Sequence, residues 1–377
     1  MHEREQILIV GGGIAGMALA HGAARAGLRV RVVEASQRAD QLGTGITLLG
    51  NALRALDRLG LAEACIAGGT GWDTVLNRDL AGNLLQELHP PRTFKPDAAG
   101  AIGIMRPVLA DILSRHADQS GAVVQYGVTV ASLEPNATGA AYTLSTGETG
   151  HCELVVAADG AYSKTRSRLW GAQYKPMYAG QGSWRYTVER PSSLKGLTFY
   201  RAEGSTVLGT LPLSKELCYF FLLESAREHL RMPEDRLEDL LRERLKRFSA
   251  PEVREAVSRI DGTRHISYRP FDILLMPKPW YRGRAVLVGD AAHSLTPHLT
   301  SGGGLALEDA VVLSEELSTT ADMDRALQRY AERRFDRVRR VYEISRRISE
   351  LEQQPTRDGE KCMELLMDGH RTLAEKF

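Results

Sequence analysis

The spacing of apolar residues at the start of the chain predicts a strand, a helix and a second strand. Residues 7–10 form an uninterrupted apolar run, residues 14–26 are rich in alanine and leucine, and residues 28–33 return to an apolar pattern after Gly27. A short continuous apolar run is typical of a strand buried in a parallel sheet, and glycine commonly ends a helix. The chain therefore begins with a βαβ unit.

Beyond this unit, the pattern changes between the period of strands and the period of helices. Alternation predicts a β-hairpin over residues 74–88, short strands over 123–146 and an antiparallel sheet over 180–223. Continuous apolar runs predict two more buried strands, at residues 153–158 and 284–289. Helical spacing predicts further helices at residues 51–60, 106–116, 235–248, 305–317, 322–352 and 355–377.

These elements predict an α/β fold with two kinds of sheet. A Rossmann-like, mainly parallel sheet is expected to be interleaved with an antiparallel-sheet domain, because no low-complexity linker separates the two patterns. A long C-terminal helix over residues 322–352 completes the fold. Its apolar positions fall at helical intervals, so its many arginines are expected to form a solvated face.

Composition excludes several classes of function. The 377 residues carry a formal net charge of +1, which gives no global electrostatic field for nucleic acid or an anionic membrane. The four cysteines are scattered, so we expect reduced thiols and no metal site. The polar N-terminus predicts no signal peptide, and no apolar run approaches the roughly 20 residues that span a bilayer. We expect a cytoplasmic enzyme, either a monomer or a homodimer.

Three glycines in the spacing GxGxxG lie between the first strand and the first helix. Gly11 permits the sharp turn, Gly13 lets the backbone approach a pyrophosphate, and Gly16 lets the helix pack closely on the strand. Glu34 ends the second strand, where a carboxylate accepts hydrogen bonds from ribose hydroxyls and repels a 2′-phosphate. The predicted ligand is the ADP half of FAD or NAD. The expected contacts are Gly11, Gly13, Ile14, Ala15, Gly16, Glu34 and Ala35.

Several later segments add to this motif. One apolar strand ends at Asp159, another ends before Asp290, and residues 297–310 (PHLTSGGGLALEDA) form a glycine-rich turn into a helix. Together with the glycine turn, residues 45–61 and the helix that opens at Arg106, they resemble the single-component class A flavoprotein aromatic hydroxylases of the para-hydroxybenzoate hydroxylase type. The resemblance covers nearly the whole chain. The short C-terminal region places it with the compact subgroup.

The resemblance implies non-covalently bound FAD, with NADH or NADPH as a transient reductant. It implies that Asp290 accepts a hydrogen bond from a ribityl hydroxyl, that Arg106 contacts FAD, and that Asp159 serves both FAD and NAD(P)H. A second GxGxxG start for a nicotinamide domain is absent, as it is in these hydroxylases. The backbone amides expected near the flavin pyrimidine ring, where they would stabilise negative charge, belong to Gly302, Gly303, Gly304 and Leu305.

The resemblance also implies a reaction. Oxygen adds to the reduced flavin as a hydroperoxide, which hydroxylates a small aromatic or heteroaromatic substrate. His298 is the candidate base, because similar enzymes for hydroxylated pyridine acids carry Pro-His here; a loop histidine bonded to backbone or solvent is the other interpretation. Thr300-Ser301 replaces the usual Gly-Gln and leaves the substrate open. The candidate pocket residues are Arg185, Tyr200, Tyr219 and Pro297.

Three interpretations remain less specific. For Arg185 a structural ion pair is favoured over a substrate carboxylate, Trp184 is expected in the core, and His293 is expected to be structural. Two alternative functions stay open, a flavin monooxygenase that modifies or inactivates a larger natural product or antibiotic, and a flavin-binding reductase without oxygenase activity. The expected domains are FAD-binding (1–73, 98–178 and 265–345), substrate-binding (74–97 and 179–264) and a C-terminal helical segment (346–377).

Overall fold

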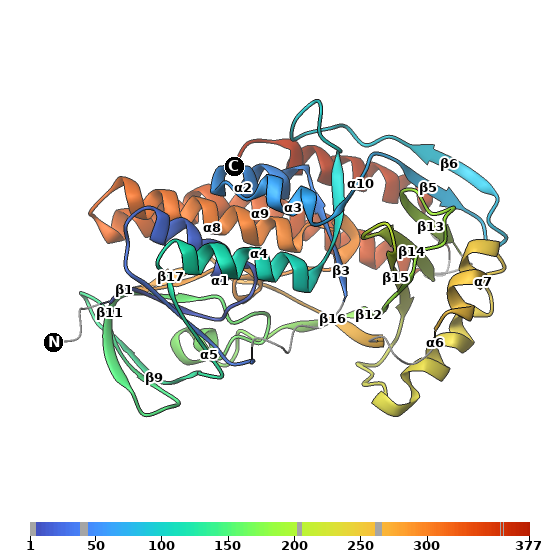
Figure 1. Ribbon diagram of the computed structural model, residues 1–377. Helices are drawn as coiled ribbons and strands as arrows, with labels where there is room; N and C mark the ends of the chain where they lie inside the picture. Colours follow the sequence, from blue (N-terminus) through green and yellow to red (C-terminus); the bar gives the residue numbers. More distant parts are fainter. Residues whose placement is uncertain (1–4, 38–43, 202–205, 261–265, 355, 357) are drawn as a thin grey trace.

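The two kinds of sheet predicted from the sequence lie side by side in the structure. The computed structural model describes residues 5–37, 44–201, 206–260, 266–354, 356 and 358–377. Figure 1 shows one sheet beneath a layer of long helices on the left and a second sheet on the right. The predicted α/β fold is confirmed.

The first sheet is mainly parallel. Within the described residues it follows the order β17 (Tyr281–Arg282), β18 (Ala285–Leu287), β11 (Thr149–Ala157), β1 (Glu5–Val10), β2 (Val30–Glu34) and β8 (Val123–Tyr126), with β10 (Ala140–Leu144) and β9 (Val130–Pro135) joined through β11. The strands from β18 to β8 run parallel to one another, as the βαβ start predicts. Ile7 and Ile9 of β1 pack beneath helices, whereas Leu8 and Val10 pack with the β9–β10 hairpin. Burial on both faces explains the continuous apolar run.

A layer of helices shares one hydrophobic core with Ile7 and Ile9. These helices are α1 (Ile14–Arg25), α2 (Gly50–Leu59), α3 (Ala62–Ala67), α4 (Arg106–Gln119), α8 (Gly302–Thr319), α9 (Met323–Glu352) and α10 (Gly359–Ala374). Helix α1 contacts both α4 and α8, so the first and the last part of the chain are neighbours. A short helix, α5 (Lys164–Trp170), follows β11. No helix in the described residues is long and apolar enough to cross a membrane.

The second sheet is antiparallel apart from one pair. Its order is β19 (His293–Ser294), β16 (Ile266–Leu275), β12 (Met177–Glu189), β15 (Leu217–Ser225), β14 (Val207–Pro212), β13 (Leu197–Arg201), β5 (Val75–Arg78) and β6 (Leu84–Leu88), in which β13 and β5 are parallel. The hairpin predicted over residues 74–88 is therefore part of this sheet. The sheet also continues into β16, beyond position 264, where the substrate domain was expected to end.

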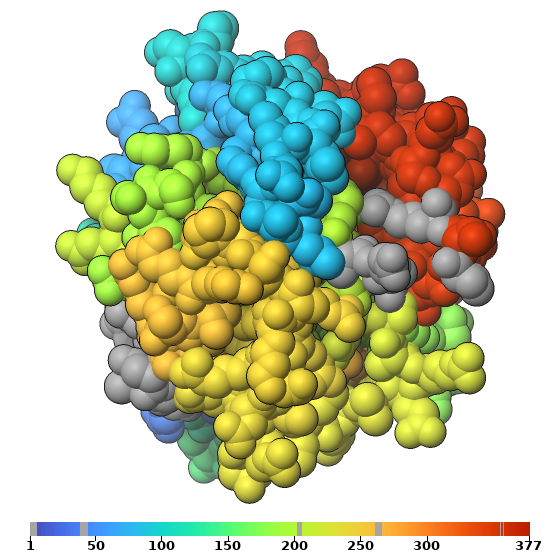
Figure 2. Space-filling view, turned by 90° about the vertical axis from the view of Figure 1, so that its right-hand side faces the viewer, coloured from blue at the N-terminus to red at the C-terminus, as the bar shows by residue number. Residues whose placement is uncertain are grey.

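Two helices cover the outer face of this second sheet. They are α6 (Leu237–Leu245) and α7 (Pro251–Ser258), and they share a core with Trp184, which is fully buried as predicted. Figure 2 looks onto this yellow surface, with the blue hairpin above it. The amides of Ser249 and Ala250 donate to the carbonyl of Leu80 in that hairpin, at 2.8 and 2.9 Å.

Three strands were not predicted as a sheet. They are β3 (Gly45–Leu49), β7 (Ala101–Met105) and β4 (Thr70–Trp72), which pair antiparallel in the order β3-β7-β4. Helix α2 follows β3 directly, and α4 follows β7 directly. This small sheet therefore fixes where two helices begin, including the position of Arg106 at the start of α4.

Candidate functional site

The glycine turn between β1 and α1 leaves no room for side chains at two positions. Gly11 has a φ of +108°, and a Cβ there would lie 2.4 Å from the carbonyl oxygen of Ala158. A Cβ at Gly16 would lie 2.0 Å from the oxygen of Gly11. Real carbon–oxygen contacts are longer, so both positions require glycine, the first for the turn and the second for helix packing.

Gly13 differs from its two partners because a Cβ there would meet nothing within 4 Å. It caps α1, whose first turn has neither a side-chain cap nor an acidic residue. The helix amides and the positive end of the helix dipole therefore face open space, which is how helices bind phosphate. Glu34 lies beside this space, where it accepts hydrogen bonds from the amides of Gly12 (2.6 Å) and Ser36 (2.8 Å).

A second glycine-rich helix start, that of α8, lies next to the first. A Cβ on Gly303 would lie 2.9 Å from Ile46 and 3.7 Å from Ile14, the first residue of α1. Helix α8 has no side-chain cap, and a Cβ at Gly302 would meet only Leu295, at 4.0 Å. The Leu305 amide donates to the oxygen of Ser301 at 2.8 Å, so the amides left for a ligand are those of residues 302–304 and exclude the predicted Leu305.

Gly289 joins these two helix starts. It has a φ of +57°, and a Cβ there would lie 3.0 Å from Ala15 of α1 and 3.4 Å from Ala306 of α8. The next residue, Asp290, has an exposed side chain, yet protein surrounds it so closely that burial raises the pKa of its carboxyl. Both properties fit a carboxylate that faces an internal open space. His293 and Arg106 oppose this rise in pKa.

Arg106, at the start of α4, belongs to the same group of charges. Burial lowers the pKa of its guanidinium, and the positive charge of Arg185 lowers it further, while Tyr219 and Asp290 act in the opposite direction. The Nε atoms of Arg106 and Arg185 are both buried without a hydrogen-bond partner. Among the described residues no carboxylate lies within ion-pair distance of Arg185, so the expected structural ion pair is absent.

Asp159 is engaged within its own turn. Its carboxylate accepts hydrogen bonds from the Thr165 amide (3.0 Å), the Thr165 hydroxyl (2.9 Å) and the Ser163 hydroxyl. Arg166, which is buried, donates to the carbonyl of Ala291 at 2.9 Å and so ties this turn to the segment that carries Asp290. Asp159 therefore stabilises its own turn, and Arg166 links that turn to the segment that carries Asp290.

The register of the antiparallel sheet separates the predicted pocket residues. Arg185 pairs with Phe221, and Tyr219 lies two residues away on the same face, beside Gly45 of β3. Tyr200 lies on the opposite face, where it is fully buried in the α6–α7 core and donates to Glu252 at 2.6 Å. The prediction of Tyr200 as a pocket residue is therefore wrong, because alternation alone does not show which face is inward.

Comparison with known proteins agrees with this geometry. The family described as FAD binding domain matches residues 4–345. The chain belongs to this family of FAD-dependent monooxygenases. It is 30% identical to an FAD-dependent urate hydroxylase of Klebsiella oxytoca over 351 residues, 88% of this chain and 86% of that protein. It is also 30% identical to 2-heptyl-3-hydroxy-4(1H)-quinolone synthase of Pseudomonas aeruginosa over 361 residues, 92% of this chain and 90% of that protein.

A solved structure of the FAD-dependent monooxygenase family has the same fold. HpxO of Klebsiella pneumoniae, in complex with FAD and uric acid, superposes with a TM-score of 0.82 at 25% identity and covers 99% of this chain and 93% of its own. The residues of our chain fit FAD. Gly13 leaves open space beside the start of α1, and the uncapped amides of α1 and α8 are available as donors. The exposed Asp290 carboxylate is an acceptor, so together these groups suit an elongated, anionic dinucleotide.

Thr300 is the residue for which the sequence resemblance led us to expect glycine. It adopts the left-handed conformation, with a φ of 52°, which is unfavourable for a β-branched residue. The turn therefore forms with threonine at this position, in a conformation that glycine would adopt more readily. His298, in the 3₁₀ turn Pro297–Leu299, points its imidazole toward Glu352, the last residue of α9, and both side chains are buried.

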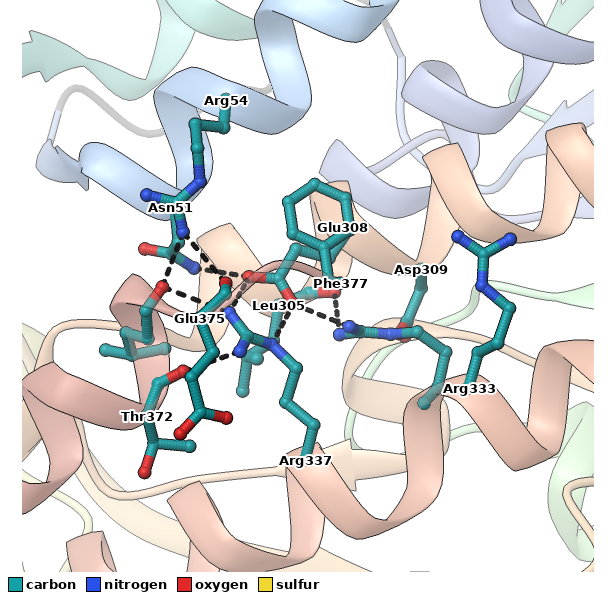
Figure 3. Close-up of polar contacts among 12 residues, drawn as sticks. Asn51, Arg54, Leu305, Glu308, Asp309, Arg333, Arg337, Thr372, Glu375 and Phe377 are labelled. Carbon is teal, nitrogen blue, oxygen red and sulfur yellow. Dashed lines mark hydrogen bonds and ion pairs between the residues drawn. The ribbon is translucent and has the colours of Figure 1, made fainter. Parts of the chain in front are cut away.

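A buried network behind α8 was not predicted. Glu308 and Asp309 are both fully buried and ion-paired with Arg334, and Glu308 also pairs with Arg337. Figure 3 shows Asn51 and Arg337 converging on Glu308. The prediction of a wholly solvated arginine face on α9 is wrong for these two arginines. Two adjacent acidic residues within an apolar helix were the available signal, since buried carboxylates need cationic partners.

Proposed function

We propose that the protein hydroxylates a small, anionic aromatic or heteroaromatic compound, using FAD, O2 and NADH or NADPH. Bound FAD would supply the redox chemistry of the reaction, with the nicotinamide as the reductant and O2 as the oxidant. The chain supplies the cradle for its phosphates at Gly13, the ribose contact at Glu34, the ribityl contact at Asp290 and the α8 amides. These amides stabilise negative charge on the reduced cofactor.

The observation that carries the substrate class is the unpaired guanidinium of Arg185. It lies near Arg106 and Tyr219 on the face of the sheet that looks toward the FAD site. Asp290 acts on the charge of Arg106, whereas no carboxylate among the described residues lies within ion-pair distance of Arg185, whose Nε is buried without a hydrogen bond. Arg185 is partly buried, so its charge gains from pairing with an anion, and a planar carboxylate or urate-like anion suits a guanidinium.

A panel of paired compounds tests this proposal. The FAD-loaded enzyme is assayed with hydroxylated benzoates, hydroxypyridine carboxylates, purines and quinolones. Each acid is compared with its own carboxamide. NADH and NADPH oxidation, oxygen uptake and product mass are then measured. We expect hydroxylation of one acid class and weak activity on its amides. Oxygen uptake without a hydroxylated product across the panel would refute the proposed function.

Replacement of Arg185 tests the substrate charge separately from the chemistry. We expect Arg185→Met to raise KM for the acid about 10- to 100-fold, the loss of a charge-assisted hydrogen bond of roughly 1.5–3 kcal/mol, and to leave the amide unaffected. Arg236→Met is a matched control, because Arg236 belongs to the same domain and its side chain is 59% exposed. An equal effect of Arg185→Met on acid and amide would contradict an anionic substrate.

A further inference from the structure

His298 and Glu352 form a buried pair between parts of the chain that are distant in sequence. The Nε2 atom of His298 lies 3.2 Å from a carboxylate oxygen of Glu352, and the two side chains are only 3% and 8% exposed. His298 precedes the glycines that start α8, whereas Glu352 ends α9. A buried carboxylate and imidazole at this distance stabilise each other only when they share a proton or a charge.

Neither nitrogen of this imidazole makes a hydrogen bond within the described chain, although Nε2 lies within ion-pair distance of Glu352. The Nδ1 atom of His298 is buried, and no hydrogen bond is made to it within the described chain. His21 shows how the same chain treats a structural histidine, since its Nδ1 lies 2.9 Å from the Ser120 hydroxyl and its Nε2 lies 2.9 Å from the Leu59 carbonyl. A buried polar nitrogen without a hydrogen bond is uncommon and needs an explanation, and Nδ1 of His293 is a second example in this chain.

One face of α9 holds in place the loop that carries Thr296 and His298. The hydroxyl of Thr296 and that of Ser345 are 2.8 Å apart, and Ser345 also donates to the carbonyl of Thr296. One turn further, Ser349 donates to Gln181 of β12 in the substrate sheet. Ser345, Ser349 and Glu352 recur at intervals of four and three residues, so they share a single helix face. That face connects the flavin-facing loop to the substrate sheet.

We propose that Glu352 is the positioning residue for His298 as the base of the hydroxylation. The proposal rests on the function proposed above. After a small rotation of either side chain from the 3.2 Å contact, the Glu352 carboxylate accepts the Nε2–H, which leaves the Nδ1 lone pair to take a proton. The O–H or ring N–H bond of the substrate breaks, a bond from Nδ1 to hydrogen forms, and the electron pair stays on the substrate. Glu352 balances the positive charge of the imidazolium, and the proton leaves to solvent with the product.

The groups around His298 support Glu352 as its positioning residue. Among the described residues, Glu352 of α9 has the carboxylate within ion-pair distance, and β16 contributes the ring of Phe271, whose centroid lies 6.2 Å from that of the imidazole. Helix α10 contributes the uncharged Gly369, which packs on Leu299 of the same turn. Because Nδ1 is shielded from bulk water, its proton comes from the substrate or from a water enclosed with it.

The test compares Glu352→Gln with Glu350→Gln in the FAD-loaded enzyme. Glu350 lies on the same helix, is 36% exposed and pairs with surface arginines, so its replacement is a matched control. The first measurement is NMR of [15N]histidine-labelled protein, with the His298 signals assigned by their loss in His298→Gln. We expect Glu352→Gln to change the protonated nitrogen or the environment of His298, and Glu350→Gln to leave both unchanged. Unchanged His298 signals in Glu352→Gln would overturn the proposal.

The second measurement is kinetic. We expect Glu352→Gln to lower kcat about 10- to 100-fold at nearly constant KM, to move the acid limb of the pH profile to lower pH, and to be partly rescued in Glu352→Asp. The double variant with His298→Gln should be no slower than His298→Gln alone. Additive losses would overturn the proposal. If the wild-type enzyme hydroxylates no compound, the proposed function fails, while the NMR comparison still decides the pairing.

Discussion

Arg334 is the side chain whose loss we expect to cost the most stability. Its guanidinium is fully buried, lies 2.7 Å from Asp309 and 2.5 Å from Glu308, and also donates to the carbonyl of Leu305. Burial opposes the charge, but the two carboxylates outweigh it and raise the pKa of Arg334. Arg334→Met keeps most of the volume and removes the charge, so two buried carboxylates each lose one cationic partner.

The magnitude follows from the partners that remain. Removal of one member of a buried ion pair costs about 3–5 kcal/mol. Glu308 keeps Arg337 and Asn51, and Asp309 keeps the imidazole of His293 at 2.7 Å and an amide. We therefore expect the lower end of the range, about 3 kcal/mol, out of a typical total of about 5–15 kcal/mol. The melting temperature should fall by several degrees.

The pH dependence of this loss has a definite sign. Burial by itself would raise the pKa of Glu308 and of Asp309, but Arg334 and their other partners lower both below the ordinary carboxyl values. Groups with lowered folded pKa values stabilise the protein above their unfolded pKa, and the contribution disappears as the pH falls through the folded pKa. Arg334→Met should therefore lose most stability near neutral pH and least in strong acid, below the ordinary carboxyl range.

Thermal and denaturant unfolding between pH 7 and pH 3 measures this difference. Arg339→Met is the matched control, because Arg339 is on the same helix and its side chain is 48% exposed. The control should unfold like the wild type. If Arg334→Met also unfolds like the wild type at pH 7, or if its deficit does not shrink in acid, the assignment of the stability to this buried pair is refuted.

Three further outcomes are expected. Gly16→Ala should abolish FAD binding, measured by flavin absorbance after purification, because the added carbon would lie 2.0 Å from a backbone oxygen; retention of flavin would contradict the close packing. Thr300→Gly should raise the free energy of unfolding by up to about 1 kcal/mol by removing a left-handed β-branched residue, and an unchanged denaturation midpoint would argue against strain there. Tyr200→Phe should cost about 1 kcal/mol of stability, because it loses the hydrogen bond to Glu252, and it should leave kcat unchanged. Tyr219→Phe, on the other face of the sheet, should change kcat or KM, and the reverse pattern would show that the wrong face was assigned.

The parts of the fold that follow from local pattern were predictable. Residues 7–33 have apolar runs, a helix and glycines that report directly on their own conformation, and the structure has β1, α1 and β2 there. The small sheet of β3, β7 and β4 was missed, because its pairing depends on contacts between segments far apart in the chain. Single-strand patterns of three to five residues do not reveal such partners.

The same distinction applies to the site. The spacing of glycines predicted the turn and the uncapped helix start, because side chains at Gly11 and Gly16 would clash with the backbone and Gly13 has open space beside it. The inward face of the antiparallel sheet could not be read from alternation, and so Tyr200 was placed with Tyr219 although they lie on opposite faces. The burial of Arg334 depends on Glu308 and Asp309 in another helix, which periodicity within α9 does not show.

The position of Gly289 between Ala15 and Ala306 also bears on how the enzyme matures during synthesis. The glycine turn of residues 11–16 leaves the ribosome first, but the surface that completes its cradle is translated near the end of the chain. A nascent chain that has not yet released α8 lacks the second helix start, and one that stops before residue 290 also lacks the Asp290 carboxylate. Cofactor loading is therefore a late event, and translation that stops before α8 yields a polypeptide that cannot retain FAD.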